Sequence, residues 1–312
     1  MIRLIVRRLA WTIVVVWFAV TATFLVTAAI PADPVKTLLG PHATAETIQR
    51  VRAHYCLDRG LAVQYGCWIG RVAHGDLGES YRSKRPVAEI IAHRIWPTVQ
   101  LAFAAIVVQL MLGVPLGIIA ATRRGRWQDR AAGAASTLAQ SAPPLFVGTV
   151  LLYVFAYRWG WFPISGYGTG GWDRIAHIVL PAMTLATVGV AYYSRVVRAE
   201  LIDQLGADYV RTARAKGLPE RVVIGRHAMR NVLGPLATLV GLDLGVLLGG
   251  AVVAEFIFAW PGLGREVLQA VLEIDIPLIL GVVMVSAIAI ALANLLVDLA
   301  YLWIDPRLHD AS

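Results

Sequence analysis

The chain has 312 residues, of which 58% are hydrophobic and only 15% are charged, and its mean hydropathy is +0.65. A soluble globular domain carries about 25% charged residues, so this composition excludes water as the solvent of most of the chain. The net charge of +8 would suit a nucleic-acid partner. However, the Lys and Arg residues gather in segments between apolar stretches, and we predict no nucleic-acid binding.

Uncharged stretches of about 20 residues or more recur along the sequence. A helix rises 1.5 Å per residue, so about 20 residues cross the roughly 30 Å hydrocarbon core of a bilayer. We therefore predict an all-α integral membrane protein with about six transmembrane helices that contact membrane lipid. The expected spans are 9–30, 99–121, 131–156, 175–194, 232–254 and 278–303.

The first span follows Arg3, Arg7 and Arg8 and could be read as a signal peptide, with Val26–Ala28 as a faint cleavage site. Its uncharged stretch is longer than the 7 to 15 residues typical of such a peptide. We therefore assign residues 1–30 to a cytoplasmic N-terminus and the first transmembrane helix.

Residues 31–98 form a long segment that is also basic. Loops longer than about 60 residues cross the membrane largely regardless of charge, so we place this segment outside the cell. Apolar residues at helical spacing predict two short helices that form a small extracytoplasmic cap. The only two cysteines, Cys56 and Cys67, both lie here. They form either a disulfide, which an oxidising compartment permits, or two free thiols in apolar packing, and we predict the disulfide.

Residues 99–312 contain the other five spans. Pro143 and Pro144 lie in the middle of the third span, where they remove backbone hydrogen bonds, so that span should be kinked or broken. Such a break either lines a cavity or reflects helix packing. Arginines crowd the link after the second span, and eight Lys and Arg residues lie from Arg195 to Arg230. The positive-inside bias places these links and both termini in the cytoplasm.

The link at 198–230 is the most informative polar stretch. From Ala207 it reads ADYVRTARAKGLPERVV, in which Gly217 and Pro219 should end one short helix and start another. The result is a basic helical hairpin that projects into the cytoplasm. We expect it to dock into a partner groove, with Tyr209, Val210 and Ala213 as the apolar anchor. Arg211 and Arg214 would form the polar rim.

The fifth span carries an ionisable residue, Asp243. A charged side chain is energetically costly inside a membrane, so its presence there indicates a functional or structural role. At 100° per residue it points away from the GxxxG seam of Gly241, Gly245 and Gly249, a motif that lets helices pack closely. Gly250 and Ala254 fall near the stripe of Asp243. We predict that these three residues line a translocation pathway; the alternative is an acid paired with a neighbouring helix for structure.

Catalytic motifs are absent from the sequence. The three lysines, Lys36, Lys84 and Lys216, do not occur in GxxxxGK[ST], so the chain has no Walker A loop for ATP. It also lacks HExxH and GxSxG motifs, and its seven histidines are scattered. We therefore expect no enzymatic activity, no metal site and no cofactor in this chain.

Several stretches in a shared order resemble one family, the B-type permease subunits of dipeptide, oligopeptide and nickel ABC importers. The stretches are Leu57-Asp58, Gln64-Tyr65 with Trp68, GDLGES from Gly75 to Ser80, Pro86-Val87 with Arg94, Pro97 and Thr98, DYVRTARAKGL from Asp208 to Leu218, His227 with Arg230-Asn231, GGAVVAEFIFAWPGLG from Gly249 to Gly264, and Asp305-Pro306-Arg307.

The resemblance implies a multi-pass permease of the bacterial inner membrane that imports peptides. Its implied partners are a sister C-type permease, two ATP-binding subunits that hold ATP and Mg²⁺, and an extracytoplasmic substrate-binding protein. The hairpin resembles the family's ATPase-coupling loop. The residues carried over to that role are Asp208, Tyr209, Val210, Arg211, Ala213, Arg214 and Gly217.

The family's coupling loop has a general form that begins EAA and places a glycine four residues later. Only Ala213 and Gly217 match it here, since Arg211 and Thr212 replace the first two residues, although Arg-Thr-Ala is usual in the peptide branch. No argument can therefore be built on the missing Glu.

Other functions remain as alternatives. The same machinery could import nickel, glutathione or another small solute. A secondary transporter would not need this hairpin and often shows inverted repeats, which we do not find. A membrane enzyme is opposed by the missing nucleophile and metal motifs.

Overall fold

The computed structural model describes residues 2–29, 44–54 and 56–304. The side chains of 2–9, 51, 54, 250 and 296–304 lie outside this description, as do all of 30–43 and the Asp305-Pro306-Arg307 stretch. The described chain is helical, with one isolated bridge between Glu79 and Pro86. Five of its helices are long and apolar enough to cross a membrane, or six if one bent pair is a single span. The predicted all-α membrane fold is confirmed.

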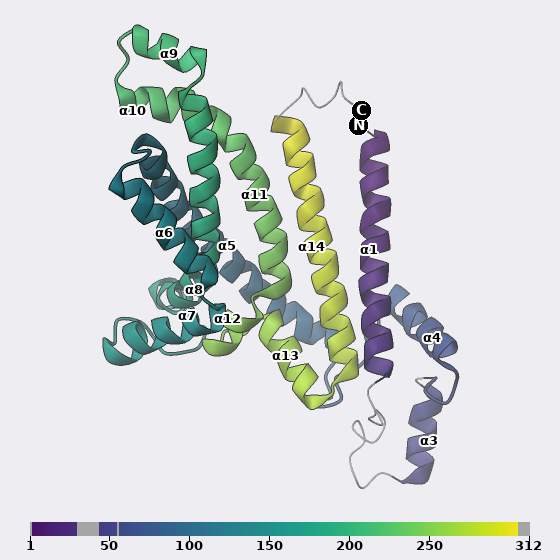
Figure 1. Ribbon diagram of the computed structural model, residues 1–312. Coiled ribbons are helices and arrows are strands. Elements are labelled where there is room, and N and C mark those ends of the chain that lie inside the picture. Colours follow the sequence, from purple (N-terminus) through teal and green to yellow (C-terminus); the bar gives the residue numbers. More distant parts are fainter. Residues whose placement is uncertain (1, 30–43, 55, 305–312) are drawn as a thin grey trace. The chain divides into compact units, whose positions relative to one another are not determined.

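The helices follow one another as Figure 1 shows. They are α1 (Ile2–Ala28), α3 (Ala45–His54), α4 (Leu61–Ala73), α5 (Val87–Thr122), α6 (Trp127–Ser141), α7 (Pro144–Leu151), the π-helical η1 (Leu152–Arg158), α8 (Gly171–Leu205), α9 (Asp208–Ala215), α10 (Glu220–Val222), the π-helical η2 (Val223–Ala228), α11 (Met229–Gly250), α12 (Val252–Ile257), α13 (Leu263–Glu273) and α14 (Ile276–Ile304).

The chain divides into two compact units. The N-terminal unit comprises residues 2–98 and 261–291, and the core unit comprises 99–260 together with the chain from 292 onward. Helix α5 therefore begins in the N-terminal unit, twelve residues before the predicted start of the second span at Val99. The span prediction counted only uncharged residues and therefore began after Arg94. The helix itself continues through Arg94, which gives α5 its additional turns at the N-terminal end.

In the N-terminal unit, α1 packs against α4 and α14. Val20 and Phe24 are buried with Trp68 of α4 and Leu280 of α14, and the Thr21 hydroxyl lies 2.6 Å from the Tyr65 hydroxyl. The other side of α1 exposes large apolar side chains, which suits contact with lipid rather than water. These side chains are Trp11, Ile13, Val14, Val15, Trp17 and Phe18.

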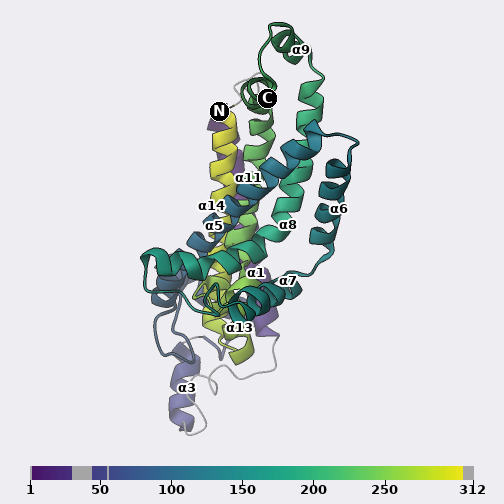
Figure 2. The ribbon, with the colours of Figure 1, turned by 90° about the vertical axis from the view of Figure 1, so that its left-hand side faces the viewer.

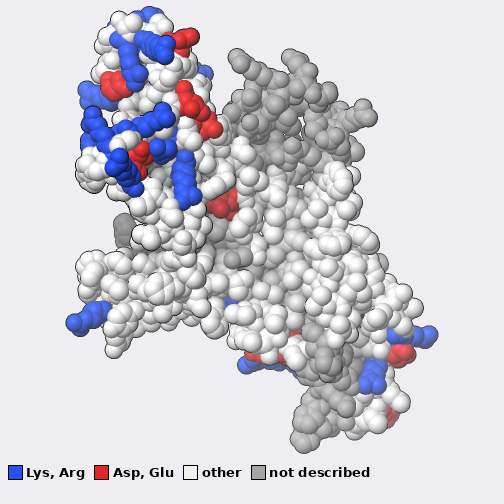
Figure 3. Space-filling view, viewed as in Figure 1, with Lys and Arg blue, Asp and Glu red and all other residues white. Residues whose placement is uncertain are grey.

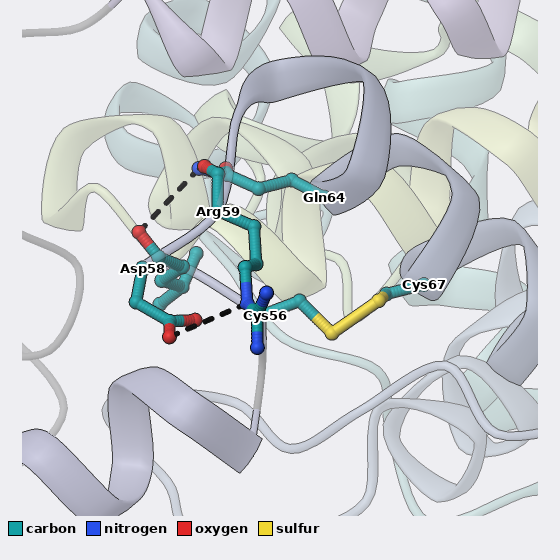
Figure 4. Close-up of a disulfide and its surroundings, with 6 residues drawn as sticks. Cys56, Asp58, Arg59, Gln64 and Cys67 are labelled. Carbon is teal, nitrogen blue, oxygen red and sulfur yellow. Dashed lines mark hydrogen bonds and ion pairs between the residues drawn. A yellow bond between two sulfur atoms is a disulfide. The ribbon is translucent and has the colours of Figure 1, made fainter.

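The predicted disulfide joins Cys56 and Cys67, whose Cα atoms lie 6.5 Å apart (Figure 4). Cys67 belongs to α4, and Cys56 lies in the turn that precedes it. Gln64 of α4 faces the same turn and donates from Nε2 to the carbonyl of Arg59 at 2.8 Å. The bridge and this hydrogen bond together fasten the turn to α4.

Asp275 fixes a second loop of the N-terminal unit. Its buried carboxylate accepts hydrogen bonds from the Ser80 hydroxyl at 2.5 Å and the Tyr81 N–H at 3.1 Å. Arg82 of this loop forms an ion pair with Glu273. Asp275, which directly precedes α14, and Glu273 at the end of α13 therefore hold this loop in place.

In the core unit, α5 and α8 approach closely. A Cβ atom at Gly113 would lie 2.8 Å from Cβ of Tyr193, and one at Gly117 would lie 2.7 Å from Cβ of Val197. Only glycine allows this approach, so α8 is the packing partner of the GxxxG motif in the second span. Helix α6 also packs along α8 (Figure 2). Arg198 donates to Asp129 of α6 from Nε at 2.6 Å and from Nη2 at 2.9 Å.

The third span is broken as its prolines predicted. Helices α6 and α7 meet at an angle of 103°. Pro143 precedes α7 in an extended conformation, and Pro144 is its first residue, where a missing N–H costs nothing. The prediction that the proline pair kinks or breaks the third span is therefore confirmed, because the chain turns there.

Candidate functional site

The predicted hairpin connects α8 to α11 at one end of the core unit (Figure 1). Helix α9 ends at Ala215, and Gly217 follows with a φ of +76°. The N–H of Leu218 bonds to the carbonyl of Ala213, and the N–H of Gly217 bonds to that of Arg214. This is a Schellman cap, which needs a left-handed residue at the glycine. Pro219 then precedes α10, so the turn is the one that Gly217 and Pro219 predicted.

The inner face of α9 is part of the protein's own core. Val210 is 0% exposed and Ala213 is 5% exposed. Both pack in one cluster with Leu201 of α8, Val223 of η2 and Val232 of α11. The prediction that Val210 and Ala213 form an apolar anchor for a partner is therefore wrong, because the amphipathic helix turns its apolar stripe toward the two helices that carry it.

The outer face of α9 is open. Arg211 has a side chain that is 74% exposed, and Tyr209 and Leu218 are 39% and 37% exposed. Asp208 and Thr212 are exposed beside them. A partner that approached the hairpin would meet this face, which is polar apart from Tyr209 and Leu218.

Polar contacts hold the hairpin at both ends. The Tyr209 hydroxyl donates to Oε1 of Gln204 at 2.6 Å, and Nδ2 of Asn231 donates to the same oxygen at 3.1 Å. These bonds join α8, α9 and α11. At the other end, Arg214 donates to both carboxylate oxygens of Glu220, at 2.6 and 3.2 Å. The Glu220 carboxylate raises the pKa of the Arg214 guanidinium, because a hydrogen bond to the charged form favours that form.

The two ends of the core unit differ in chemistry. Lys and Arg residues gather over α9, α10 and the start of α6 (Figure 3). The stretch from η1 to the start of α8 instead exposes aromatic rings, which are typical of a membrane–water interface. These rings are Tyr153, Tyr157, Trp159, Trp161 and Trp172.

Asp243 lies on α11 and is half-buried. Its carboxylate interacts with Gln109 of α5 and Tyr193 of α8. Both of these side chains are 1% exposed. A Cβ atom at Gly189 would lie 2.2 Å from Nε2 of Gln109. The Gln109 amide therefore occupies space that only a glycine at position 189 leaves free.

Of the other two predicted pathway residues, only Gly250 lies on the same helix as Asp243, seven positions later. Helix α11 ends at Gly250, whose surroundings lie outside the described side chains. Ala254 belongs to the separate helix α12 and is 0% exposed. The predicted stripe does not extend to Ala254, because the prediction assumed one continuous helix over 232–254, whereas the chain leaves α11 at Ala251. Ala254 faces the interior of its own unit.

Sequence reasoning missed Gln109, Tyr193, Gln204 and Asn231. A polar glutamine inside an otherwise apolar span was a signal for the first of them. Among the described residues, no group of three or more His, Cys, Asp and Glu side chains could hold a metal ion.

Comparison with known proteins gives two family matches. Residues 113–310 match the family described as "Binding-protein-dependent transport system inner membrane component". Residues 1–102 match the family described as "Binding-prot-dependent transport system membrane comp, N-term".

Curated relatives match over almost the full length. A protein of Brucella suis biovar 1, provisionally named as a peptide transport system permease, is 36% identical over 314 residues, with 99% of each chain covered. The glutathione transport system permease protein GsiC of Escherichia coli O6:H1 is 38% identical over 309 residues, also with 99% of each chain covered.

One solved structure has a similar fold. It is a chain of the MetNI methionine ABC transporter in an inward-facing conformation, which superposes with a TM-score of 0.56. The alignment covers 69% of this chain and 96% of that chain at 17% identity, which is a likeness of fold alone.

Proposed function

Since the chain belongs to the inner-membrane components of binding-protein-dependent transport systems, as a multi-pass permease of an ABC importer, we propose that it forms half of the import pathway for di- or oligopeptides. The other half would be a sister permease. Two separate ATPase subunits would supply the energy, because this sequence has no Walker A loop. An extracytoplasmic binding protein would deliver the substrate.

The relatives support a peptide substrate and one specific alternative. One is named for peptides and another for glutathione, which is itself a small peptide-like thiol. The purified importer with its binding protein, reconstituted in proteoliposomes, should take up labelled dipeptides and tripeptides in an ATP-dependent manner. ATP-dependent uptake of glutathione without uptake of ordinary peptides would replace the peptide proposal with the alternative.

The hairpin is the proposed contact with the ATPases, and one observation carries this proposal. Its outer face is exposed, whereas its inner face is buried against α8 and α11. Packed side chains transmit displacement because protein interiors are close to crystal density. A push on the outer face of α9 would therefore move α8 and α11. Val210 and Ala213 would connect the hairpin to the spans, and Tyr209, Arg211 and Leu218 would meet the ATPase.

Charge reversal on the outer face tests this contact. Arg211→Glu should weaken co-purification of the ATPases and abolish ATP-dependent uptake, while membrane insertion stays normal. Arg226→Glu is the matched control, because Arg226 is also exposed and basic but lies on η2 rather than on α9. Equal ATPase association and uptake in the wild type and Arg211→Glu would show that this face is not the coupling contact.

The proposed topology places the hairpin and both termini in the cytoplasm. The gathering of Lys and Arg at the hairpin end, opposite the aromatic stretch in the core unit, supports it. Leu38, which would report on the outer side, lies outside the described residues.

Asp243 is also proposed to face the passing substrate. Its carboxylate is half-buried, so one side remains open to a cationic group such as a peptide's amino terminus. Asp243→Asn should then reduce peptide uptake with normal assembly. Wild-type uptake by this variant would remove the pathway role.

A further inference from the structure

Three polar side chains meet inside the membrane-spanning part of the core unit. Gln109, Tyr193 and Asp243 come from α5, α8 and α11, and the first two are fully buried. Gly189 lies directly beneath the Gln109 amide, so a larger residue there would displace it.

Three oxygen atoms of this cluster are short of partners. Oε1 of Gln109, the hydroxyl oxygen of Tyr193 and Oδ2 of Asp243 are buried and make no hydrogen bond within the described part of the chain. A buried polar atom without a partner is destabilising, and a charged one more so. By contrast, the buried carboxylate of Asp275 accepts hydrogen bonds from several donors.

The cluster also lacks a positive charge. Among the described residues, no Lys, Arg or His side chain forms an ion pair with Asp243, and its polar neighbours Gln109 and Tyr193 are neutral. An isolated carboxylate within a membrane span is costly unless a counter-charge compensates it. A water molecule could supply hydrogen bonds here, but it would leave this charge uncompensated.

We propose that Gln109, Tyr193 and Asp243 bind one small monovalent cation. The three free atoms are an amide, a phenol and a carboxylate oxygen, and all of them offer lone pairs. One carboxylate matches a single positive charge. A divalent cation requires more oxygen ligands and more negative charge, and a soft metal prefers sulfur or imidazole ligands.

The bound charge could come from two sources with the same chemistry toward these oxygens. An alkali ion would accept the lone pairs, and a primary ammonium group would donate N–H bonds to them. In either case the cation would tie together α5, α8 and α11. The last two carry the hairpin, so occupancy would stiffen the frame through which that hairpin acts.

Thermal unfolding of the purified importer in lipid nanodiscs tests the site without any transport step. The Tm is measured against rising NaCl, KCl or methylammonium chloride, with choline chloride replacing them at constant ionic strength. Binding to the folded state should raise the Tm with concentration until the site is saturated. A response to Na⁺ or K⁺ identifies a free ion, and a response to methylammonium alone identifies an amine.

Asp243→Asn should weaken cation binding and therefore raise the half-saturating concentration at least tenfold. In choline alone it should unfold at a higher temperature than the wild type, because it removes the uncompensated charge; in saturating cation the order should reverse. Tyr193→Phe removes one oxygen without changing charge and should also weaken the response. Asp203→Asn, an exposed position on α8, is the charge-matched control and should respond as the wild type does.

A Tm that no cation changes relative to choline would overturn the proposal. So would a cation response of equal midpoint in the wild type and Asp243→Asn. If Asp243→Asn does not fold, an unchanged response in Tyr193→Phe has the same meaning. Peptide uptake does not enter these measurements, so failure of the site and failure of the import function are distinguishable.

Discussion

Ala213→Asp probes how the hairpin is built. Ala213 is 5% exposed and lies in the cluster that joins α9 to α8, η2 and α11. An aspartate there would bury a carboxylate without a partner, which costs about 3 to 5 kcal/mol. Because each 1.4 kcal/mol is a factor of ten, the hairpin should open roughly 10²- to 4 × 10³-fold more often. Loss of ATPase association in this variant would therefore follow from a disordered hairpin.

Ala215→Asp is the matched control. It makes the same substitution two residues later, where the side chain is exposed. Its cost should be below about 1 kcal/mol, most of it from a negative charge at a helix C-terminus.

Hydrogen exchange of the purified importer, followed by mass spectrometry of peptides from the hairpin, measures this opening directly. Ala213→Asp should lose protection at residues 208–223, and Ala215→Asp should keep it. Equal protection in the two variants would refute the inward orientation of Ala213 and restore the idea of an anchor that enters a partner.

Three further outcomes are expected. Alkylation without reductant should add no label to Cys56 or Cys67 in an intact-mass measurement, and their bridge, with a sequence separation of 11, should contribute about 3 kcal/mol; two adducts would mean free thiols. Gly117→Val should lower the Tm, since its side chain would overlap Val197 of α8. The control Gly133→Val should leave the Tm unchanged, because a side chain there meets nothing within 4 Å. Equal Tm values in the two variants would contradict the close helix approach. Lys216→Cys should react with a membrane-impermeant maleimide only in inverted vesicles; labelling in intact cells would reverse the topology.

The sequence determined those features that act within a few residues. Composition required a membrane protein, because apolar stretches of this length have no stable place in water. Pro143 and Pro144 predicted the break between α6 and α7, and Gly217 with Pro219 predicted the turn of the hairpin. These residues act through their own backbone dihedrals, so no distant contact is needed to read them.

Only the tertiary structure decided which face of each helix is buried. The stretch around Val210 and Ala213 is amphipathic in the sequence, but the pattern does not say whether the apolar stripe meets a partner or the chain itself. The convergence of Gln109, Tyr193 and Asp243 likewise depends on α5, α8 and α11, which are far apart in sequence. The physical reason is that burial arises from packing between helices, whereas periodicity describes one helix alone.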